Sequence, residues 1–159
     1  MTASAQNLNN DPVLQWVTFS LDQEVYGVNV LQVQEVLRVT DITPVPGATD
    51  YVLGIINLRG HIVTVVDTRR LFHLSPREPD DASRIVIIEI NKQTAGILVD
   101  AVTEVVDLRA SEIEASPSVG HEQNTEFIQG VYSRNGELLI LVDLNRLFTE
   151  TEAQALASL

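Results

Sequence analysis

The 159-residue chain is long enough for one domain or two small ones with a sizeable core. Hydrophobic residues make up 45% of it but aromatic residues only 5%, so the core must consist of Val, Ile and Leu, which favour strands and predict an all-β, β-rich fold with short helices. A net charge of −12 disfavours a surface that follows nucleic-acid phosphates, and we expect no nucleic-acid partner.

The absence of cysteine excludes disulfides, thiol nucleophiles and cysteine-ligated metals. Residues 1–13 are polar and lack the basic and apolar regions of a signal peptide, so we expect a disordered tail. The apolar runs, such as LLILV at 138–142, are shorter than the ~18 residues that a transmembrane helix needs. We therefore expect a cytoplasmic protein without membrane insertion.

The first predicted elements are two strands joined by a turn. Val17, Phe19 and Leu21 alternate with polar residues, and Gly27 suits the partner strand that follows the turn at 22–24. The next segment, VLQVQEVLRV at 30–39, fits both helical spacing and strand alternation. We expect a helical turn at 30–34 that leads into a strand.

A second pair of strands is predicted at 52–58 and 62–66, joined by a turn at Arg59 and Gly60. The run at 62–66 is apolar apart from Thr64, which is typical of a strand buried on both faces. Asp67 is expected to cap a short helix that starts at the next residue, because its carboxylate can accept the free amides of the first turn.

The rest of the chain contains fewer predicted elements. The stretch at 73–84 is rich in proline and charge and is expected to be a linker. Between 109 and 126, Ser111 and Glu114 resemble a capping box for one short helix. The tail at 150–159 lacks strong β-formers, and we expect a short helix there.

The chain contains a duplicated unit. YVLGIINLRGHIVTVVDTRRLF at 51–72 aligns without a gap with FIQGVYSRNGELLILVDLNRLF at 127–148, and residues 19–36 align in the same way with 88–105. Two copies do not make a solenoid, which needs at least about three repeats. We therefore expect one domain at 14–150 with two similar subdomains, at about 16–72 and about 85–148.

Residues that could carry chemistry have simpler explanations. Asp67 and Asp143 occupy matching positions as in an aspartic protease, but Arg69 stands where that family needs glycine, and two helix caps explain both aspartates. The histidines are isolated and the glycines form no phosphate-binding motif, so no metal or cofactor is expected; the histidines are His61, His73 and His121. Two alternatives stay open: a hydrolase that uses the two aspartates, and a small-ligand or nucleotide-binding module that uses the cleft between subdomains.

Arg59 is the exception, because it places the only nearby positive charge beside strongly apolar strands. The second copy has Asn135 at this position. A duplication that keeps its fold residues but differs here suggests a task that the fold does not demand. The alternative is an arginine that is merely solvated in a turn.

GIINLRGHIVTVVD at 54–67 resembles the signature of the CheW family of chemotaxis coupling proteins, and FSLDQEVYGVNVLQVQEV at 19–36 resembles the opening of that family. The resemblance extends over about residues 16–148. It implies two five-stranded, SH3-like β-barrels packed around a shared core, without catalytic activity. It also implies an adaptor that couples the cytoplasmic hairpin tips of chemoreceptors to the regulatory domain of the chemotaxis histidine kinase, in the cytoplasm at membrane-bound receptor arrays.

The resemblance also implies a receptor-binding site in the groove between the subdomains. Its residues in this chain are Arg59, Glu35, Val33 and Gly54. Thr64 stands where the family commonly has proline, and a threonine suits a strand. Kinase contacts use the outer ends of the barrels in the family and carry no motif that can be transferred to named residues.

Glu35 lies in an apolar stretch, where a lone carboxylate would be costly if it were buried. We expect it to pair with Arg59 and to hold the guanidinium in the orientation that the receptor needs. The alternative is that Glu35 points to solvent and that its counterpart Glu104 reflects only shared ancestry.

Overall fold

The computed structural model describes residues 11–115 and 127–147. Residues 1–10, 116–126 and 148–159 lie outside the described residues, and with them most of the predicted N-terminal tail, the C-terminal tail and His121. Within the described part, no helix is long and apolar enough to cross a membrane.

Ten strands and a few short helical segments form the described part, and the prediction of an all-β fold is confirmed. In chain order they are β1 (Val13–Leu21), β2 (Glu24–Asn29), η1 (Val30–Gln32), β3 (Val33–Arg38), β4 (Val52–Leu58), β5 (His61–Asp67), α2 (Thr68–Leu71), β6 (Arg84–Ile90), β7 (Gln93–Val99), β8 (Ala101–Arg109), η2 (Ala110–Glu112), β9 (Ile128–Arg134), β10 (Glu137–Val142) and α3 (Leu144–Leu147). The helical turn predicted at 30–34 is the 3₁₀ turn η1, and the strand predicted after it is β3. The short helix predicted to follow a Ser111 cap is wrong in position, because the 3₁₀ turn η2 begins at Ala110 with Arg109 as its N-cap, and Glu112 accepts a hydrogen bond from the Arg109 N–H (2.8 Å).

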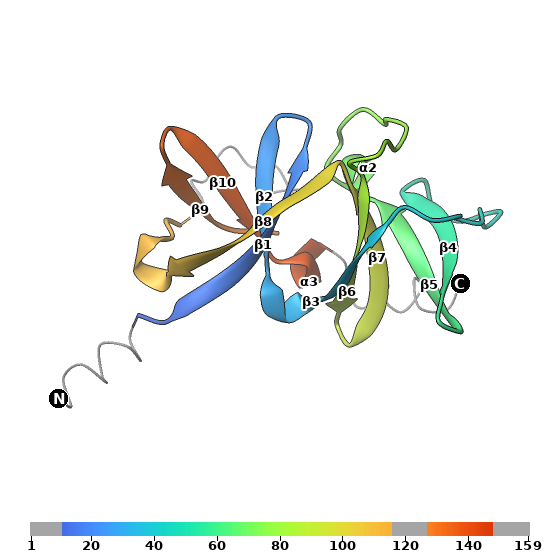
Figure 1. Cartoon of the computed structure of the whole chain (residues 1–159), viewed down its shortest axis with the longest axis horizontal. Helices are drawn as coiled ribbons and strands as arrows, with labels where there is room; N and C mark the ends of the chain where they lie inside the picture. The colour runs from blue at the N-terminus through green and yellow to red at the C-terminus, as the bar shows by residue number, and fades with distance from the viewer. Residues whose placement is uncertain (1–10, 116–126, 148–159) are drawn as a thin grey trace.

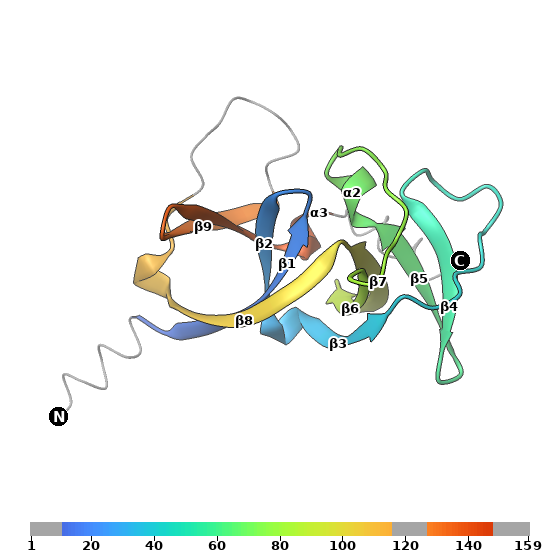
Figure 2. The ribbon, with the colours of Figure 1, turned by 45° about the horizontal axis from the view of Figure 1, so that its top comes forward.

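The strands form two five-stranded sheets that lie side by side (Figures 1 and 2). Sheet A has the order β8-β1-β2-β10-β9, and sheet B has the order β3-β6-β7-β5-β4. The two orders become identical when each strand is replaced by its counterpart in the other sequence copy, so the duplication is visible in the fold.

Each sheet takes strands from both copies, which corrects the predicted division into 16–72 and 85–148. The first copy gives β1 and β2 to sheet A and gives β3, β4 and β5 to sheet B. After η1 the chain leaves sheet A, and β3 pairs with β6 of the second copy instead of returning to β2. The parallel pairs β2–β10 and β5–β7 join the copies within each sheet. The sequence copy and the sheet are therefore different units.

One isolated bridge joins the two edges of each sheet. In sheet B, Thr43 lies beyond β3 and exchanges two backbone hydrogen bonds of 2.9 Å with Ile55 of β4. In sheet A, Glu114 lies beyond β8 and exchanges two bonds of 2.9 Å with Val131 of β9. These bridges close both sheets into barrels, as the resemblance implied.

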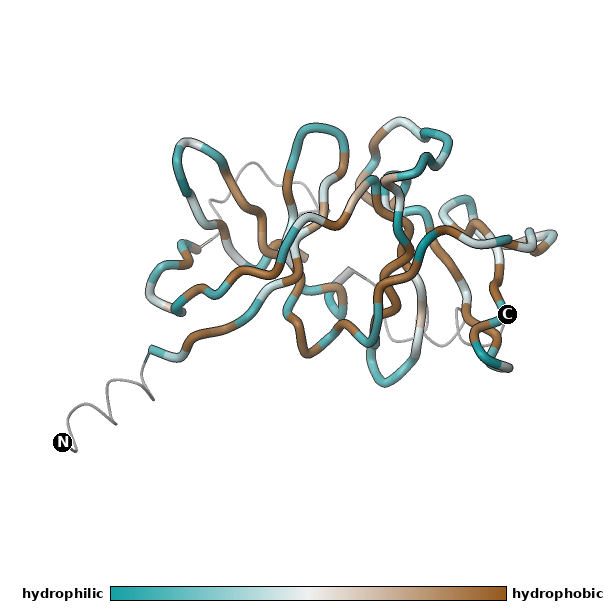
Figure 3. Tube along the Cα trace, viewed as in Figure 1, coloured by the Kyte–Doolittle hydropathy of each residue, from teal (hydrophilic) through white to brown (hydrophobic). Residues whose placement is uncertain are grey.

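The hydrophobic core of the described residues has three parts. One is a layer between the two sheets, and the other two fill the interiors of the two barrels. Along β6, Val86 and Ile88 face the layer between the sheets, whereas Ile85 and Ile87 face the interior of sheet B. Trp16 and Leu141 belong to the smaller interior of sheet A. Hydrophobic segments accordingly gather along the middle of the molecule, and the hairpin tips are hydrophilic (Figure 3). This division explains why β5 and β6 are apolar on both faces.

Arg69 in α2 links the two sheets. Its side chain is 8% exposed, and its Nη2 and Nη1 lie 2.6 Å from Asp22 and 2.7 Å from Asp100. Asp22 belongs to the β1–β2 turn of sheet A, and Asp100 connects β7 of sheet B to β8 of sheet A. Burial opposes the charge, but the hydrogen bond to Asp22 and the charges of both aspartates outweigh it and raise the pKa of Arg69. The ion pairs therefore stabilise the contact between sheets.

Replacing Arg69 with methionine should lower the free energy of unfolding by about 3 kcal/mol, because Asp100 stays buried without its main partner. The loss should stay at the low end for a broken buried pair, since Arg77 lies 3.6 Å from the same carboxylate. Urea unfolding measures the change. Arg70→Met is the control, because Arg70 is 44% exposed and its ion pair with Asp67 is a longer one of 3.7 Å, so the loss should stay below about 1 kcal/mol. Equal losses in both variants would contradict the role of Arg69.

Candidate functional site

The β4–β5 turn places Arg59 at the end of a hairpin of sheet B. Arg59 has a φ of 50° and Gly60 a φ of 88°, the two positive values of a type I′ turn. The Asn57 side chain fixes this turn by accepting the Gly60 N–H (2.8 Å). A side chain other than Asn, Asp or Gly is uncommon at a positive φ. An arginine held there against its backbone preference makes this position a candidate for function.

Glu35 of β3 pairs with Arg59. Arg59 Nη1 donates to Glu35 Oε1 (3.3 Å), and Nη2 donates to Oε2 in a second, shorter contact. The arginine side chain is 69% exposed and the glutamate side chain 30% exposed. The hydrogen bond from Arg59 lowers the pKa of Glu35, and the same bond, with the charge of Glu35, raises the pKa of Arg59. The predicted ion pair is therefore confirmed, and the alternative of an unpaired Glu35 in solvent is wrong.

The pair lies in an open hollow of about 470 Å³. Its lining comes from β3, the β4–β5 hairpin and the β6–β7 turn with the start of β7, all in sheet B. The hollow is therefore formed by one sheet, whereas the resemblance implied a groove between subdomains. Ile62 lies beside the pair and is 56% exposed, so the hollow combines a charged pair with an apolar side chain.

Val33 and Gly54 do not line this hollow. Val33 is half-buried and packs against the core between the sheets. Gly54 is buried, and a Cβ atom built on it would lie 2.1 Å from the carbonyl oxygen of Thr43, the residue that closes the barrel. The structure thus brings two of the four predicted site residues together and gives each of the other two a place in the fold.

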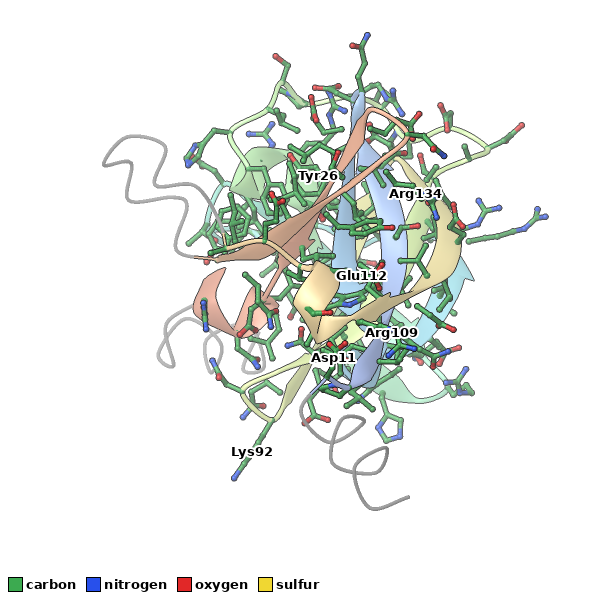
Figure 4. The ribbon with its side chains drawn as sticks, turned by 90° about the vertical axis from the view of Figure 1, so that its left-hand side faces the viewer. Asp11, Tyr26, Lys92, Arg109, Glu112 and Arg134 are labelled. Carbon is green, nitrogen blue, oxygen red and sulfur yellow. The ribbon has the colours of Figure 1, made fainter. Side chains whose placement is uncertain are left out.

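Sheet A has a counterpart of this hollow, with a volume of about 180 Å³. Glu104 corresponds to Glu35, and its Oε2 lies 3.4 Å from Nη2 of Arg134. The alignment of the two copies did not predict this pair. It matches Arg59 with Asn135, whereas the arginine of the second copy, Arg134, stands one residue earlier. Figure 4 shows Arg134 on the side of the molecule formed by sheet A.

The aspartates that could suggest a protease serve as helix caps. Asp67 Oδ1 accepts the Arg69 N–H (3.0 Å), and Asp143 Oδ1 accepts the Asn145 N–H (3.0 Å). This use of both carboxylates confirms the predicted caps. Among residues 11–115 and 127–147, no three His, Cys, Asp or Glu side chains are grouped in a way that could hold a metal ion.

Comparison with known proteins identifies relatives across almost the whole chain. Residues 15–152 match the CheW-like domain. The chain is 32% identical to the chemotaxis protein CheW of Treponema pallidum, over 94% of this chain and 91% of that protein, and 30% identical to CheW of Rhizobium meliloti, over 98% and 99%. Its fold is similar to the crystal structure of the scaffolding protein TtCheW from Thermoanaerobacter tengcongensis, with a TM-score of 0.77 and 37% identity over 86% of this chain and 88% of that one.

Proposed function

The chain belongs to the CheW-like domain family, and we propose that it is a non-catalytic chemotaxis adaptor that couples chemoreceptor signalling tips to the chemotaxis histidine kinase. The observation that carries the proposal is the Glu35–Arg59 pair in an open hollow, on a chain whose relatives are named as chemotaxis and scaffolding proteins. The receptor tip binds at this hollow, and the kinase binds at another face.

The chemistry of the hollow supports binding rather than catalysis. Arg59 and Glu35 satisfy each other, and Ile62 offers an apolar contact beside them. Arginine with an adjacent aliphatic side chain is a common centre of a protein interface, because a planar guanidinium pairs with carboxylates and amides while the apolar neighbour excludes water. A tether of this kind acts through effective concentration and through coupling of conformational states, and it needs no reacting group.

The proposal is tested by mixing the pure chain with a fragment of a chemoreceptor hairpin tip and with a chemotaxis histidine kinase. Co-sedimentation measures assembly, and the rate of kinase autophosphorylation measures coupling. We expect the three components to sediment together and the rate to depend on the receptor fragment only when the chain is present. A rate that is unaffected by the chain would contradict the adaptor function.

The Glu35–Arg59 pair should prepare the guanidinium for the receptor. Glu35→Gln and Arg59→Gln should each weaken binding of the receptor tip, and the double variant should lose less than the product of the two fold-changes, because both single changes remove the same pair. Isothermal titration of the four proteins gives the coupling. Fold-changes that multiply would show that the two side chains act independently.

The same pair predicts how binding varies with pH. Because the folded-state pKa of Glu35 is lowered, its charge and the bond to Arg59 are present above the ordinary glutamate pKa of about 4.3 and are lost as the pH falls through the folded-state value. The contribution of the Glu35 charge to the coupling should therefore be constant between about pH 6 and pH 8, which titrations of the four proteins at both pH values measure.

A further inference from the structure

The hollow that holds Arg59 has a second cation on its lining. Lys92 belongs to the β6–β7 turn and lines the hollow together with Arg59 and Glu35. It is the only lysine in the chain. Figure 4 shows its side chain projecting from the tip of this hairpin. Glu35 is already paired with Arg59, so the hollow presents an additional positive charge on a chain with a net charge of −12.

The backbone of the β6–β7 turn disfavours a lysine at this position. Ile90 pairs with Gln93, which leaves a two-residue turn in which Asn91 has a φ of 47° and Lys92 a φ of 70°. Such a turn prefers Asn followed by Gly. The β9–β10 turn of sheet A has this sequence, Asn135 and Gly136, with φ values of 53° and 80°.

Two turns of sheet B differ from the preferred Asn-Gly sequence, and in both a basic residue takes one of the two positions. Arg59 replaces the asparagine in the β4–β5 turn, and Lys92 replaces the glycine in the β6–β7 turn. Both basic residues line the same hollow. Residues kept at a cost in backbone energy are candidates for function. Two such residues of the same charge at one hollow indicate a ligand with negative charge.

The other sheet holds the β6–β7 turn in place. Asn145 of α3 follows the last strand of sheet A, and its Oδ1 accepts the Asn91 N–H across the two sheets (3.0 Å). At the corresponding positions of the first copy, Arg69 and Asp22 form an ion pair. Asn145 therefore fixes the position of Lys92 relative to the rest of the molecule.

We propose that Lys92 is a specificity-determining residue of the receptor hollow. The hollow receives a carboxylate of the receptor segment together with an apolar side chain beside it. Asn145 is the positioning residue of this contact. The inference rests on the proposed function and adds the chemistry of the partner: Lys92 pairs with the carboxylate, and Ile62 contacts the apolar side chain. Electrostatic complementarity of this kind selects the partner and speeds its association.

Lys92→Gly separates binding from folding, because glycine suits the positive φ better than lysine does. We expect a melting temperature that is unchanged or higher, with affinity for the receptor-tip fragment about fivefold to tenfold weaker and less dependent on salt. Lys92→Arg should keep most of the affinity. Asn145→Ala should weaken binding about threefold, whereas Asn145→Asp, which keeps the accepting oxygen, should not.

A carbodiimide, which joins an amine to a carboxylate without a spacer, gives an independent measurement. Because Lys92 is the only lysine, a crosslink that joins a side-chain amine of this chain to a carboxylate of the receptor fragment can form only at Lys92, and mass spectrometry should find it there. Full affinity of Lys92→Gly, with no crosslink at Lys92 and with binding still lost in Arg59→Ala, would overturn the inference and leave the proposed function standing. Failure of the unmodified chain to bind would overturn both.

Discussion

Arg59→Ala is expected to weaken binding of the receptor tip about thirtyfold or more, the loss of an interface hot spot. Arg59 is 69% exposed, and its side chain makes its ion pair with Glu35 at the surface of sheet B. Alanine has the same difficulty with a φ of 50° as arginine, so the turn should not change in stability. The melting temperature should therefore stay within about 2 °C. Titration calorimetry and thermal unfolding measure the two effects.

The chain supplies its own control for this result. Arg134 is 51% exposed and pairs with Glu104 in the counterpart hollow of sheet A, so Arg134→Ala removes a similar group from a similar place. We expect it to leave receptor binding unchanged. Kinase binding should survive in Arg59→Ala, because the kinase is proposed to use another face. Equal loss of both partners, or a collapsed melting curve, would assign Arg59 to folding.

The strands, turns and caps could be predicted from the sequence because each depends on local chemistry. The apolar run at 62–66 belongs to β5, and the Asp67 side chain caps α2. The Glu35–Arg59 pair could also be predicted, because few cations stand near that carboxylate in an acidic chain. These inferences needed only neighbours, spacing and charge.

The exchange of strands between copies could not be predicted in this way. The alternation along β3 is the same whether the strand pairs with β2 or with β6, so the pattern does not name the partner. The Asn145–Asn91 contact depends on this exchange of strands, as does the place of Lys92 in the same hollow as Arg59. These residues come together through the topology, and their side chains carry no motif.

The role of Gly54 shows the same limit. Gly54 begins the segment that resembles the family signature, and the resemblance assigned it to the receptor site. In the structure, Gly54 lies against Thr43, at the bridge that closes sheet B. Its φ is 151°, which a side chain rarely adopts, and its missing Cβ leaves room for the carbonyl group of Thr43. That carbonyl cannot move away easily, because it accepts the Ile55 N–H at 2.9 Å.

Gly54→Ala is therefore expected to lower the free energy of unfolding by about 3 to 4 kcal/mol, from backbone strain together with loss of the bridge between Thr43 and Ile55. Gly60→Ala is the matched control. Gly60 has a φ of 88° with nothing within 4 Å of a built Cβ, so it should lose only about 1 kcal/mol. Urea unfolding of the two variants measures the difference. The fraction of Gly54→Ala that remains folded should bind the receptor tip with nearly normal affinity, because Arg59, Glu35 and Lys92 are unchanged. A stable Gly54→Ala protein that has lost the receptor would instead make Gly54 a contact residue.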